Sequence, residues 1–320
     1  MKRSVISGLI SLFITFISLS TPATAVEMNS DHRGPYGNIH LGGGVLSGHP
    51  SGLDVLDDNE RRDDLNSQNS RLSEGQLLLS ADLGYIFKEG TTLGAGIRTE
   101  GPLYLSLSHE VEGVGDLSLS ALYEKKDVWK NPYLVGVDRS RTDHESFGFS
   151  ADMKQILGTG MRIVFQQMNV DVKDDLIGQA EPDLRRDGTD TTLGIGYDWN
   201  LGAGGALSSS LSHTRLDREG AGNRGCTYAV ELKHLLGAGR LTFASGLELK
   251  ETQFDASHPI FNKKRQESTY GVSEMISFAD PLGYENWSIF MLVAYSATDS
   301  NISFIDRSVS LVGSGIGYKF

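Results

Sequence analysis

The sequence predicts an all-β chain that closes into a transmembrane, antiparallel, up-and-down β-barrel. Three observations predict this fold. Hydrophobic side chains alternate with small or polar ones in segments of about ten residues, which is typical of strands that meet lipid on one face only. The connections between these segments alternate between short and long along most of the chain. The last segment ends on an aromatic residue, Phe320, where soluble proteins usually have frayed, polar residues.

The first 25 residues are typical of a secretory signal peptide. Lys2 and Arg3 form a short positive region, an apolar stretch covers residues 5–19, and residues 23–25 are small. The apolar stretch is too short for a membrane-spanning helix, which needs roughly 20 apolar residues. We therefore expect cleavage after Ala25, which leaves residues 26–320 as a single barrel domain.

Composition excludes several classes of partner and structure. Removal of the signal peptide takes away two cations and changes the formal net charge from −12 to −14, which argues against nucleic acid or a polyanionic substrate. The lone cysteine, Cys226, cannot form an internal disulfide. The chain has 38 glycines, which helices tolerate poorly and curved strands use for kinks and close packing.

Turn residues divide the rest of the chain into fourteen expected strands. Short connectors such as 158–160 alternate with long polar ones such as 49–75, as expected for short periplasmic turns and longer outer loops. An even count places both chain ends on the periplasmic side, and twelve strands is the alternative if 91–111 is mispaired. The expected strands are 36–47, 76–87, 91–98, 103–111, 116–125, 145–156, 161–172, 189–200, 206–216, 226–236, 240–253, 267–279, 286–298 and 307–320.

Charged side chains recur on the strand face opposite the apolar face. An Arg or Lys that faces lipid near the bilayer midplane costs about 2–4 kcal/mol, so several of them would prevent a stable barrel. We therefore expect these residues to line the lumen, where both signs occur and many should pair or be hydrated. The expected lumen-lining residues are Asp82, Arg98, Asp152, Lys154, Asp198, Glu231, Lys233, Glu248 and Lys250.

A soluble β-sandwich is the alternative architecture. Its strands would also alternate, but it would not require outward apolar residues on nearly every strand or an aromatic terminus. In a barrel, aromatic residues near strand ends form girdles at the two membrane interfaces. The expected girdle residues are Tyr85, Phe87, Tyr123, Tyr197, Trp199, Trp287, Tyr295, Tyr318 and Phe320.

No pattern in the sequence indicates catalysis. A nucleophile elbow, an H-E-x-x-H pattern, a phosphate-binding loop and a C-x-x-C pair are all missing. Ser212 and His213, with Asp217 nearby, come nearest to a nucleophile set, but a serine-rich lumenal strand that continues into an outer loop is the favoured interpretation. We expect no enzyme activity, no cofactor and no metal site.

Two charge runs lie in expected loops. The acidic run from Asp54 to Asp64 carries the oxygen ligands that calcium prefers, but it lacks a regular ligand spacing and a central glycine, so a solvated loop is favoured. The basic run Lys-Lys-Arg at 263–265 is compatible with lipopolysaccharide phosphates, which Arg binds in bidentate fashion, and equally with a solvated loop.

The final expected strand resembles the terminal strand of Gram-negative outer-membrane barrels. The residues that carry this resemblance are Val312, Ile316, Tyr318 and Phe320, which share one strand face. The resemblance implies that the barrel-insertion machinery reads this strand during biogenesis. It also implies a place in the bacterial outer membrane, with outer-membrane lipid and lipopolysaccharide as partners.

Four other stretches resemble an uncharacterised family of Gram-negative outer-membrane proteins, known as a domain of unknown function. They are Asn131-Pro132-Tyr133-Leu134, His258-Pro259-Ile260-Phe261 with the basic run after it, Glu285-Asn286-Trp287-Ser288, and Asp299-Ser300-Asn301-Ile302-Ser303-Phe304. The resemblance covers most of the mature chain and implies a porin-like outer-membrane barrel. None of its motifs is catalytic, and it supplies no substrate.

A channel is the first functional expectation. About eight strands enclose a lumen filled by side chains and about sixteen leave an aqueous pore, so fourteen predicts a narrow pore for small hydrophilic solutes. Lumenal charges would set its ion selectivity, and the loop at 49–75 is a candidate gate. The alternative is a surface or structural barrel that acts through its loops as an adhesin, a receptor or a lipopolysaccharide contact. A fatty-acid transporter is a third option, although few residues precede the first strand to form a plug.

Overall fold

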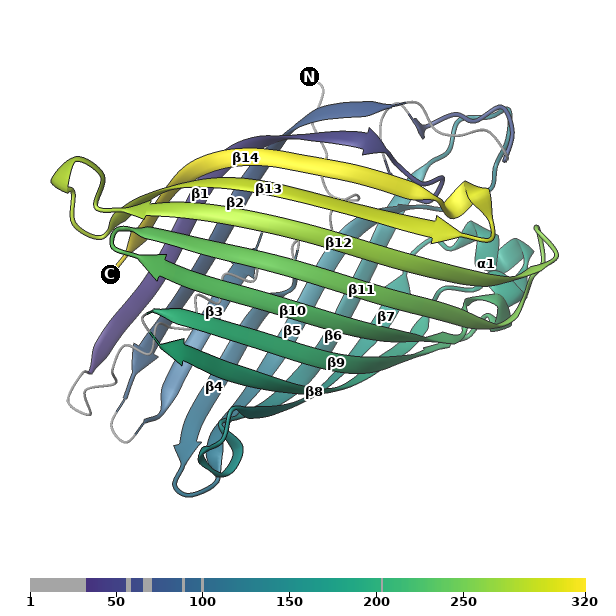
Figure 1. Cartoon of the computed structure of the whole chain (residues 1–320). Helices are drawn as coiled ribbons and strands as arrows, with labels where there is room; N and C mark the ends of the chain where they lie inside the picture. The colour runs from purple at the N-terminus through teal and green to yellow at the C-terminus, as the bar shows by residue number, and fades with distance from the viewer. Residues whose placement is uncertain (1–32, 56–58, 66–70, 88–89, 99–100, 203) are drawn as a thin grey trace.

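Fourteen antiparallel strands form a closed ring, in which each strand pairs with its neighbours in the chain and β1 pairs with β14 (Figure 1). The computed structural model describes residues 33–55, 59–65, 71–87, 90–98, 101–202 and 204–320, and the expected signal peptide lies outside them. The strands are β1 (Gly34–His49), β2 (Leu72–Ile86), β3 (Thr92–Arg98), β4 (Leu103–Val111), β5 (Gly115–Trp129), β6 (Arg141–Lys154), β7 (Met161–Val172), β8 (Gly188–Gly202), β9 (Gly205–Arg218), β10 (Gly225–Ala238), β11 (Leu241–His258), β12 (Lys263–Ala279), β13 (Trp287–Ser300) and β14 (Arg307–Lys319).

The predicted barrel and its strand count are confirmed. Twelve strands is wrong, because β3 and β4 are separate strands that pair with each other and with β2 and β5. Several strands run further into the loops than predicted. β11 continues to His258 and β12 begins at Lys263, so most of 255–266 is strand. Among the described residues, no helix is long and apolar enough to cross a membrane.

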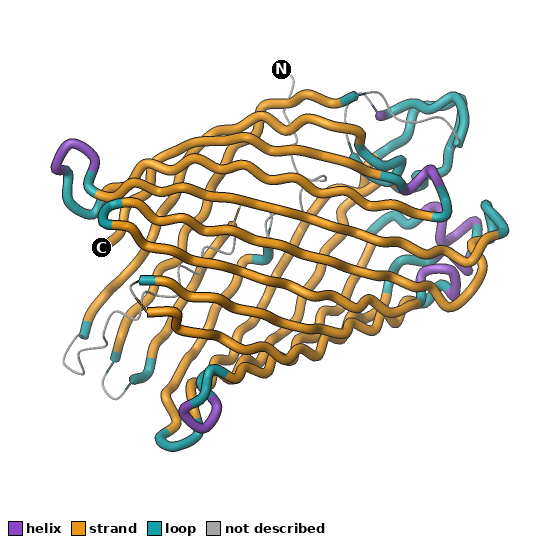
Figure 2. Tube along the Cα trace, viewed as in Figure 1, coloured by secondary structure: helices purple, strands orange, loops and turns teal. Residues whose placement is uncertain are grey.

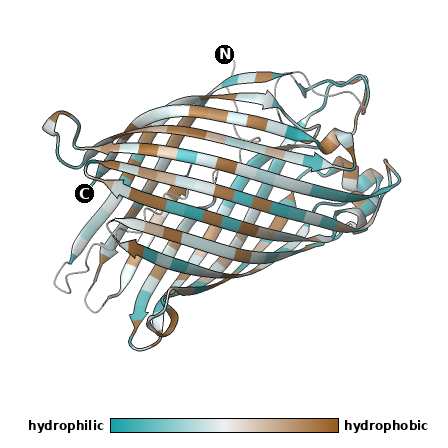
Figure 3. Ribbon diagram, in the orientation of Figure 1, coloured by the Kyte–Doolittle hydropathy of each residue, from teal (hydrophilic) through white to brown (hydrophobic). Residues whose placement is uncertain are grey.

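An apolar belt covers the outer surface of the barrel. Figure 3 shows the alternation of hydrophobic and more polar residues along the strands. On β4, for example, Leu103, Leu105 and Leu107 are exposed, whereas Tyr104 and Ser106 between them are partly buried on the other face. A continuous apolar surface of this kind is unfavourable in water, and in a bilayer it is the surface that meets lipid. The alternation therefore defines an outer face, which meets lipid, and an inner face, which meets the lumen.

The expected aromatic girdle residues include three ring pairs at strand ends. The ring centroids of Tyr85 and Phe87 are 4.9 Å apart, those of Tyr197 and Trp199 are 4.8 Å apart, and those of Trp287 and Tyr318 are 5.0 Å apart. All three pairs lie near the same end of the barrel, beside short connections. Rings with an apolar body and a polar group suit the boundary between hydrocarbon and water.

The first and last strands form the seam of the barrel. Their register runs from Asn38 opposite Lys319 to His49 opposite Ser308. Beyond this ladder, Gly37 and Phe320 exchange two backbone hydrogen bonds of 3.0 Å each. Phe320 is therefore held by its backbone, while its ring stays about half exposed beside Tyr318.

Glycines on the inner face make room for large neighbouring side chains. A Cβ atom at Gly315 would lie 2.6 Å from the ring of Phe290, which crosses it from the next strand. The ring of Tyr104 covers Gly96 in the same way. These rings lie flat along the wall, so bulky inner residues do not all project toward the barrel axis.

The two ends of the barrel differ in their connections (Figure 2). At the end that holds the chain's C-terminus, which we call the turn end, strands are joined by short turns such as 239–240. At the other end, which we call the loop end, the connections include 130–140 and 173–187, and the latter contains α1 (Leu176–Ala180). In outer-membrane barrels the short turns face the periplasm and the longer loops face outward.

Candidate functional site

Ion pairs join most of the charged residues that were expected in the lumen. Asp82 and Arg98, on the inner faces of β2 and β3, are 3.8 Å apart. The hydroxyl of Tyr104 on β4 donates a hydrogen bond to the same carboxylate. This group therefore connects three adjacent strands through one acid.

A second group lies on β6 and β7. The Arg162 guanidinium donates to both Asp152 carboxylate oxygens, with Nε at 2.9 Å and Nη2 at 2.5 Å, and the Lys154 ammonium is 3.9 Å from the same carboxylate. The bidentate geometry is the strong form of an Arg–carboxylate contact. The strand pattern predicted that Asp152 and Lys154 line the lumen, but it did not identify Arg162. Arg162 comes from the facing strand, whose register relative to β6 could not be assigned from the sequence.

The third group is on β10 and β11, where two acids face each other across the strands. Glu231 lies opposite Glu248 in the register, and each has its own lysine, Lys233 at 3.2 Å from Glu231 and Lys250 in contact with Glu248. Opposed like charges destabilise a sheet unless cations offset them. Asp198, the last of the expected lumenal residues, is exposed and forms no ion pair with another described residue.

Further charges on the inner face were missed by sequence reasoning. Arg218 Nη2 donates to Asp190 Oδ2 at 2.5 Å, and Lys126 Nζ is 3.5 Å from Glu124 Oε1. Lys126 and Arg218 lie where loops were expected, so their inward direction could not be read from strand alternation. Their presence extends the charged wall toward the loop end.

An apolar part of the inner face was also missed, and we call it the apolar sector. Its members are buried and form one cluster on β1, β2, β12, β13 and β14: Leu46, Leu72, Leu78, Met275, Phe290, Leu292, Ala294, Val309 and Leu311. The available signal was the unbroken apolar run 289–294, since a strand that is apolar on both faces shows no alternation. The inner wall thus has two unlike sides, one charged and one apolar.

The residues nearest to a nucleophile set do not meet. Ser212 and His213 are consecutive in β9 and therefore point to opposite faces. The His213 ring lies outside the barrel, with its centroid 4.9 Å from that of the exposed Tyr228. The described geometry favours the interpretation as an ordinary strand.

Five loops pack together at the loop end, and we call this assembly the cap. It comprises the described residues of 50–65, 130–140, 173–187, 258–262 and 301–306. Arg139 is its central side chain and is 1% exposed. Its Nη1 donates to the carbonyl oxygens of Gly52 and Pro132, both at 2.8 Å, and its Nη2 donates to that of Asn59. One guanidinium therefore joins the loop 50–65 to the loop 130–140.

Asp54 strengthens the same junction. Its backbone oxygen accepts a 2.9 Å hydrogen bond from the indole of Trp129, and its carboxylate accepts one of 2.6 Å from the Ser51 amide and lies 3.6 Å from Arg307. Burial raises the pKa of this carboxyl, although Arg307 opposes the rise. The first member of the acidic run is thus a buried structural residue, although a solvated loop was favoured for the run; Asp57 and Asp58 lie outside the described residues. Within the described ranges, no group of three or more His, Cys, Asp or Glu side chains is placed to hold a metal ion.

Four rings form the centre of the cap. The ring centroid of Tyr133 is 5.1 Å from that of His258, 5.8 Å from that of Phe261 and 5.3 Å from that of Phe304. A 2.9 Å hydrogen bond joins His258 Nε2 and the Tyr133 hydroxyl, and the Arg62 guanidinium lies 4.8 Å from the Phe304 ring centroid. Tyr133 follows β5 and Phe261 precedes β12, on opposite sides of the ring of strands. The cap therefore reaches across the mouth of the barrel.

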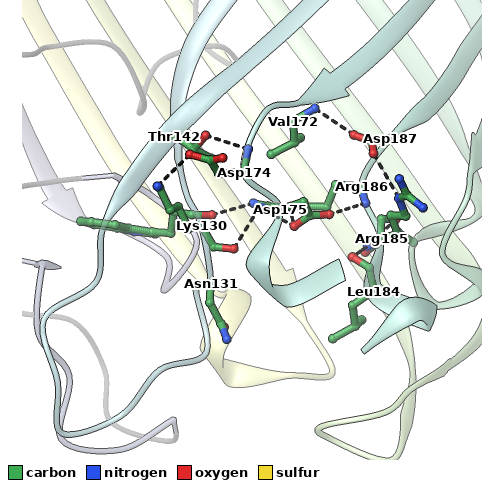
Figure 4. Close-up of polar contacts among 12 residues, drawn as sticks. Lys130, Asn131, Thr142, Val172, Asp174, Asp175, Leu184, Arg185, Arg186 and Asp187 are labelled. Atoms are coloured by element: carbon green, nitrogen blue, oxygen red, sulfur yellow. Dashed lines mark hydrogen bonds and ion pairs between the residues drawn. The ribbon is translucent and has the colours of Figure 1, made fainter. Parts of the chain in front are cut away.

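The loop 173–187 adds a polar network at the side of the cap (Figure 4). Arg186 pairs with Asp175 at 2.7 Å and also donates to the backbone oxygens of Trp129 and Lys130. The Lys130 ammonium pairs with Asp174 at 2.7 Å. These contacts hold the loop 173–187 against the end of β5.

The basic run 263–265 contributes to the cap as well. Arg265 lies 3.4 Å from the ring centroid of Phe254 and pairs with Glu267 at 2.9 Å, and Lys263 donates to the backbone oxygen of Asn301. Two of the three basic residues thus have contacts inside the protein. A contact with lipopolysaccharide stays a prediction.

Burial within the cap shifts two basic groups in the direction of their neutral forms. His258 is fully buried, and this burial, together with the nearby Arg265, lowers the pKa of its imidazole to about 4. Burial beside Arg62 lowers the pKa of Arg139 to about 10, which still leaves it charged near neutral pH. The cap therefore contains a neutral histidine and a buried cation.

Three of the four stretches that carried the family resemblance meet in this cap, whereas Glu285-Asn286-Trp287-Ser288 lies at the turn end. Tyr133 comes from the first of them, His258 and Phe261 from the second, and Phe304 from the last. The chemistry of each stretch alone did not indicate that the rings touch. The arrangement brings together loops that are separated by many strands, and it places the packed cap above the charged wall.

One comparison with a solved structure supports the fold. The chain is similar to the CymD monoaromatic hydrocarbon channel, with a TM-score of 0.53 and 10% identity over 98% of this chain and 97% of that chain. It is also similar to a Pseudomonas aeruginosa FadL homologue, with a TM-score of 0.44 and 12% identity over 90% and 89% of the two chains. At such identities the likeness is one of fold alone.

Comparisons of sequence identify the family. No curated protein matches the chain. The model of the family described as "Protein of unknown function (DUF2860)" matches residues 34–319, from the first strand to the last. The resemblance seen in the sequence is confirmed, and the chain belongs to the DUF2860 family.

Proposed function

We propose that this protein is a narrow, gated channel of the bacterial outer membrane that admits small hydrophilic solutes. The observation that carries the proposal is the inner wall. The apolar sector is buried, whereas Lys154, Arg162 and Lys233 keep between 33% and 46% of their side-chain surface exposed. A solute that enters the lumen would therefore meet the charged side of the wall.

The proposal includes the surroundings of the barrel. Outer-membrane lipid would contact the apolar belt, and lipopolysaccharide would contact the polar residues above it. Val312, Ile316, Tyr318 and Phe320 would be the residues that the insertion machinery reads. The alternating belt and the aromatic strand ends support this location.

The cap is the proposed gate. The sequence suggested a gate at 49–75, and the described part of that loop is one of five that pack across the mouth. Contacts between loops, such as those of Arg139, would have to break for the mouth to open. We therefore expect brief openings in the native protein and longer ones when the cap is loosened.

Planar-bilayer recording of the purified, refolded barrel tests the proposal. Native protein should give short conductance steps, and R139A should give longer ones. The charged wall should also set selectivity, so K154Q, which removes a lumenal cation and leaves Asp152 paired with Arg162, should shift the reversal potential toward cation preference. K264Q, on the exposed outer side of β12, is the matched control and should not.

If native protein and R139A both form sealed barrels without conductance, the channel hypothesis is wrong. A surface barrel that acts through its loops then becomes the better hypothesis. If K154Q and K264Q change the reversal potential equally, the charged inner wall does not set the ion selectivity.

A further inference from the structure

A short polar row interrupts the apolar belt on three adjacent strands. His234 on β10 lies opposite Ser245 on β11, and Ser245 lies opposite Glu274 on β12. All three belong to the outer face. The residues before and after them on that face are apolar: Leu232, Leu236, Phe243, Leu247, Val272 and Ile276.

Glu274 lies near the middle of the belt. On its strand it is midway between Tyr270 and Phe278, and its nearest outer neighbours, Val272 and Ile276, are 49% and 38% exposed. On the neighbouring strand β13, the residue opposite Glu274 is Val293. An acidic side chain at this depth faces hydrocarbon, where acidic groups are unfavourable and rare without a partner.

No described residue provides that partner. The carboxylate of Glu274 has no hydrogen bond and no ion pair with the described part of the chain. His234 cannot reach it within one barrel, because two strand spacings separate them by about 10 Å. The partner must therefore come from outside the barrel.

We propose that this row is a contact surface for a second copy of the same chain. A twofold axis along the bilayer normal, passing beside Ser245, brings β10 of each copy opposite β12 of the other. The strand tilt separates His234 and Glu274 by about 6 Å in depth, a distance that an imidazole and a carboxylate side chain can span. His234 of one barrel therefore pairs with Glu274 of its partner, and the reverse pair forms as well. The acid and the imidazole at the two ends of the row make the surface complementary to itself.

Two further features favour a second copy over an unrelated partner. The central residue of the row is a serine, which is small enough to allow close approach of two walls. The wall on the other side of the barrel has no such row, since its outer residues at comparable positions, such as Leu41, Leu105 and Leu119, are apolar. The feature therefore marks one wall of the barrel and is self-complementary in charge.

Cysteine cross-linking in lipid vesicles locates the contact. In full-length protein carrying C226S, a cysteine introduced by S245C should give a cross-linked dimer with a short thiol-specific reagent. S314C, an outer serine on β14, is the matched control and should remain monomeric. Equal cross-linking of the two variants, or none at S245C, would overturn the proposal, as would cross-linking of S245C to a different protein in cell membranes.

A charge exchange tests the pairing itself. H234E places two acids opposite each other at both contacts and should reduce the dimer fraction of S245C at least several-fold. Adding E274H to H234E restores an acid opposite an imidazole and should recover the dimer. Heat-modified gel migration checks that each barrel is folded. Folded H234E that dimerises like the native protein, or a folded double variant that stays monomeric, would show that the row does not join two copies.

Discussion

At the turn end of the barrel, the connections are stabilised mainly by residues that are neighbours in the sequence, whereas at the loop end buried side chains join residues far apart. The turn after β10 is two residues long and relies on Gly239, whose φ is +61°. In the turn after β12, the Asn286 amide donates to the Asp280 carboxylate at 3.0 Å. In the cap, by contrast, Arg139 binds Gly52 and His258 binds Tyr133.

This difference predicts how much of the structure a single substitution should affect at each end. A turn depends on its own few residues, so its loss affects one hairpin. The cap depends on a small number of side chains that several loops share, so the loss of one of them should release more than one loop. Changes at the two ends of the barrel separate these behaviours.

The largest expected effect is that of R139A. Three carbonyl oxygens lose their donor, and a buried polar group without a partner costs about 1–3 kcal/mol, so the closed cap should lose several kcal/mol. Hydrogen exchange of the amides in 51–55 and 130–140 should accelerate by at least a hundredfold. The matched control is R240A at the turn end, where one exposed contact to the Asp280 carbonyl is lost.

R240A should leave exchange in the cap unchanged. If the cap amides exchange as slowly in R139A as in R240A, the cap is not held by shared side chains. The comparison between the two ends of the barrel then fails.

An intermediate effect is expected from acid. The pKa of His258 is about 4 in the closed cap and near 6.5 when the side chain is exposed, so the open cap binds more protons between these values. The cap is therefore fully stable above about pH 6.5 and loses up to about 3 kcal/mol as the pH falls to 4. Exchange rates in the cap, measured from pH 7 to pH 4 and corrected for intrinsic rates, should show this loss.

H258F keeps a ring in the cluster and removes the titrating group. It should weaken the cap at neutral pH by about 1 kcal/mol through the lost Tyr133 hydrogen bond, and its cap should lose the acid response between these pH values. An unchanged pH profile in H258F would place the titration elsewhere.

The smallest effect is expected at the turn end from G239A. A Cβ in the left-handed region costs about 1–2 kcal/mol, and open space around Gly239 means that no clash adds to this cost. The urea midpoint of the barrel should fall slightly while cap exchange stays unchanged. G237A, in the same hairpin but without a positive φ, should have a smaller effect. A larger loss in G237A would contradict the account of this turn.

The strands could be predicted because the bilayer imposes the same alternation on every one of them. Prediction was least accurate where strands leave the membrane, as at His258 and Lys263, since polar residues there are compatible with either loop or strand. The apolar sector was missed because part of it shows no alternation between apolar and polar residues. Its residues on β13 lie in a run, 289–294, that is apolar on both faces, so alternation gave no inward direction there.

The types of residue on the inner face of the candidate site could be predicted, but the contacts among them could not. Lipid excludes charge, so Asp152 and Glu248 could be assigned to the inner face as a class. Their neighbours on the facing strands depend on register, which brings Arg162 to Asp152 and Glu231 to Glu248, and a single sequence does not specify it. The cap was harder, because Arg139 lies in a polar stretch and its contacts involve loops 80 or more residues away.

The seam between β1 and β14 has a consequence for how the chain reaches this state. The residues that pair across it, such as Asn38 and Lys319, lie almost at opposite ends of the sequence. Contacts of such long range are slow to form, and until they form both strands have exposed amides and carbonyls that could pair with another chain. Assembly would therefore pass through an open sheet that needs protection from aggregation, and the ring would be completed when these two edges meet.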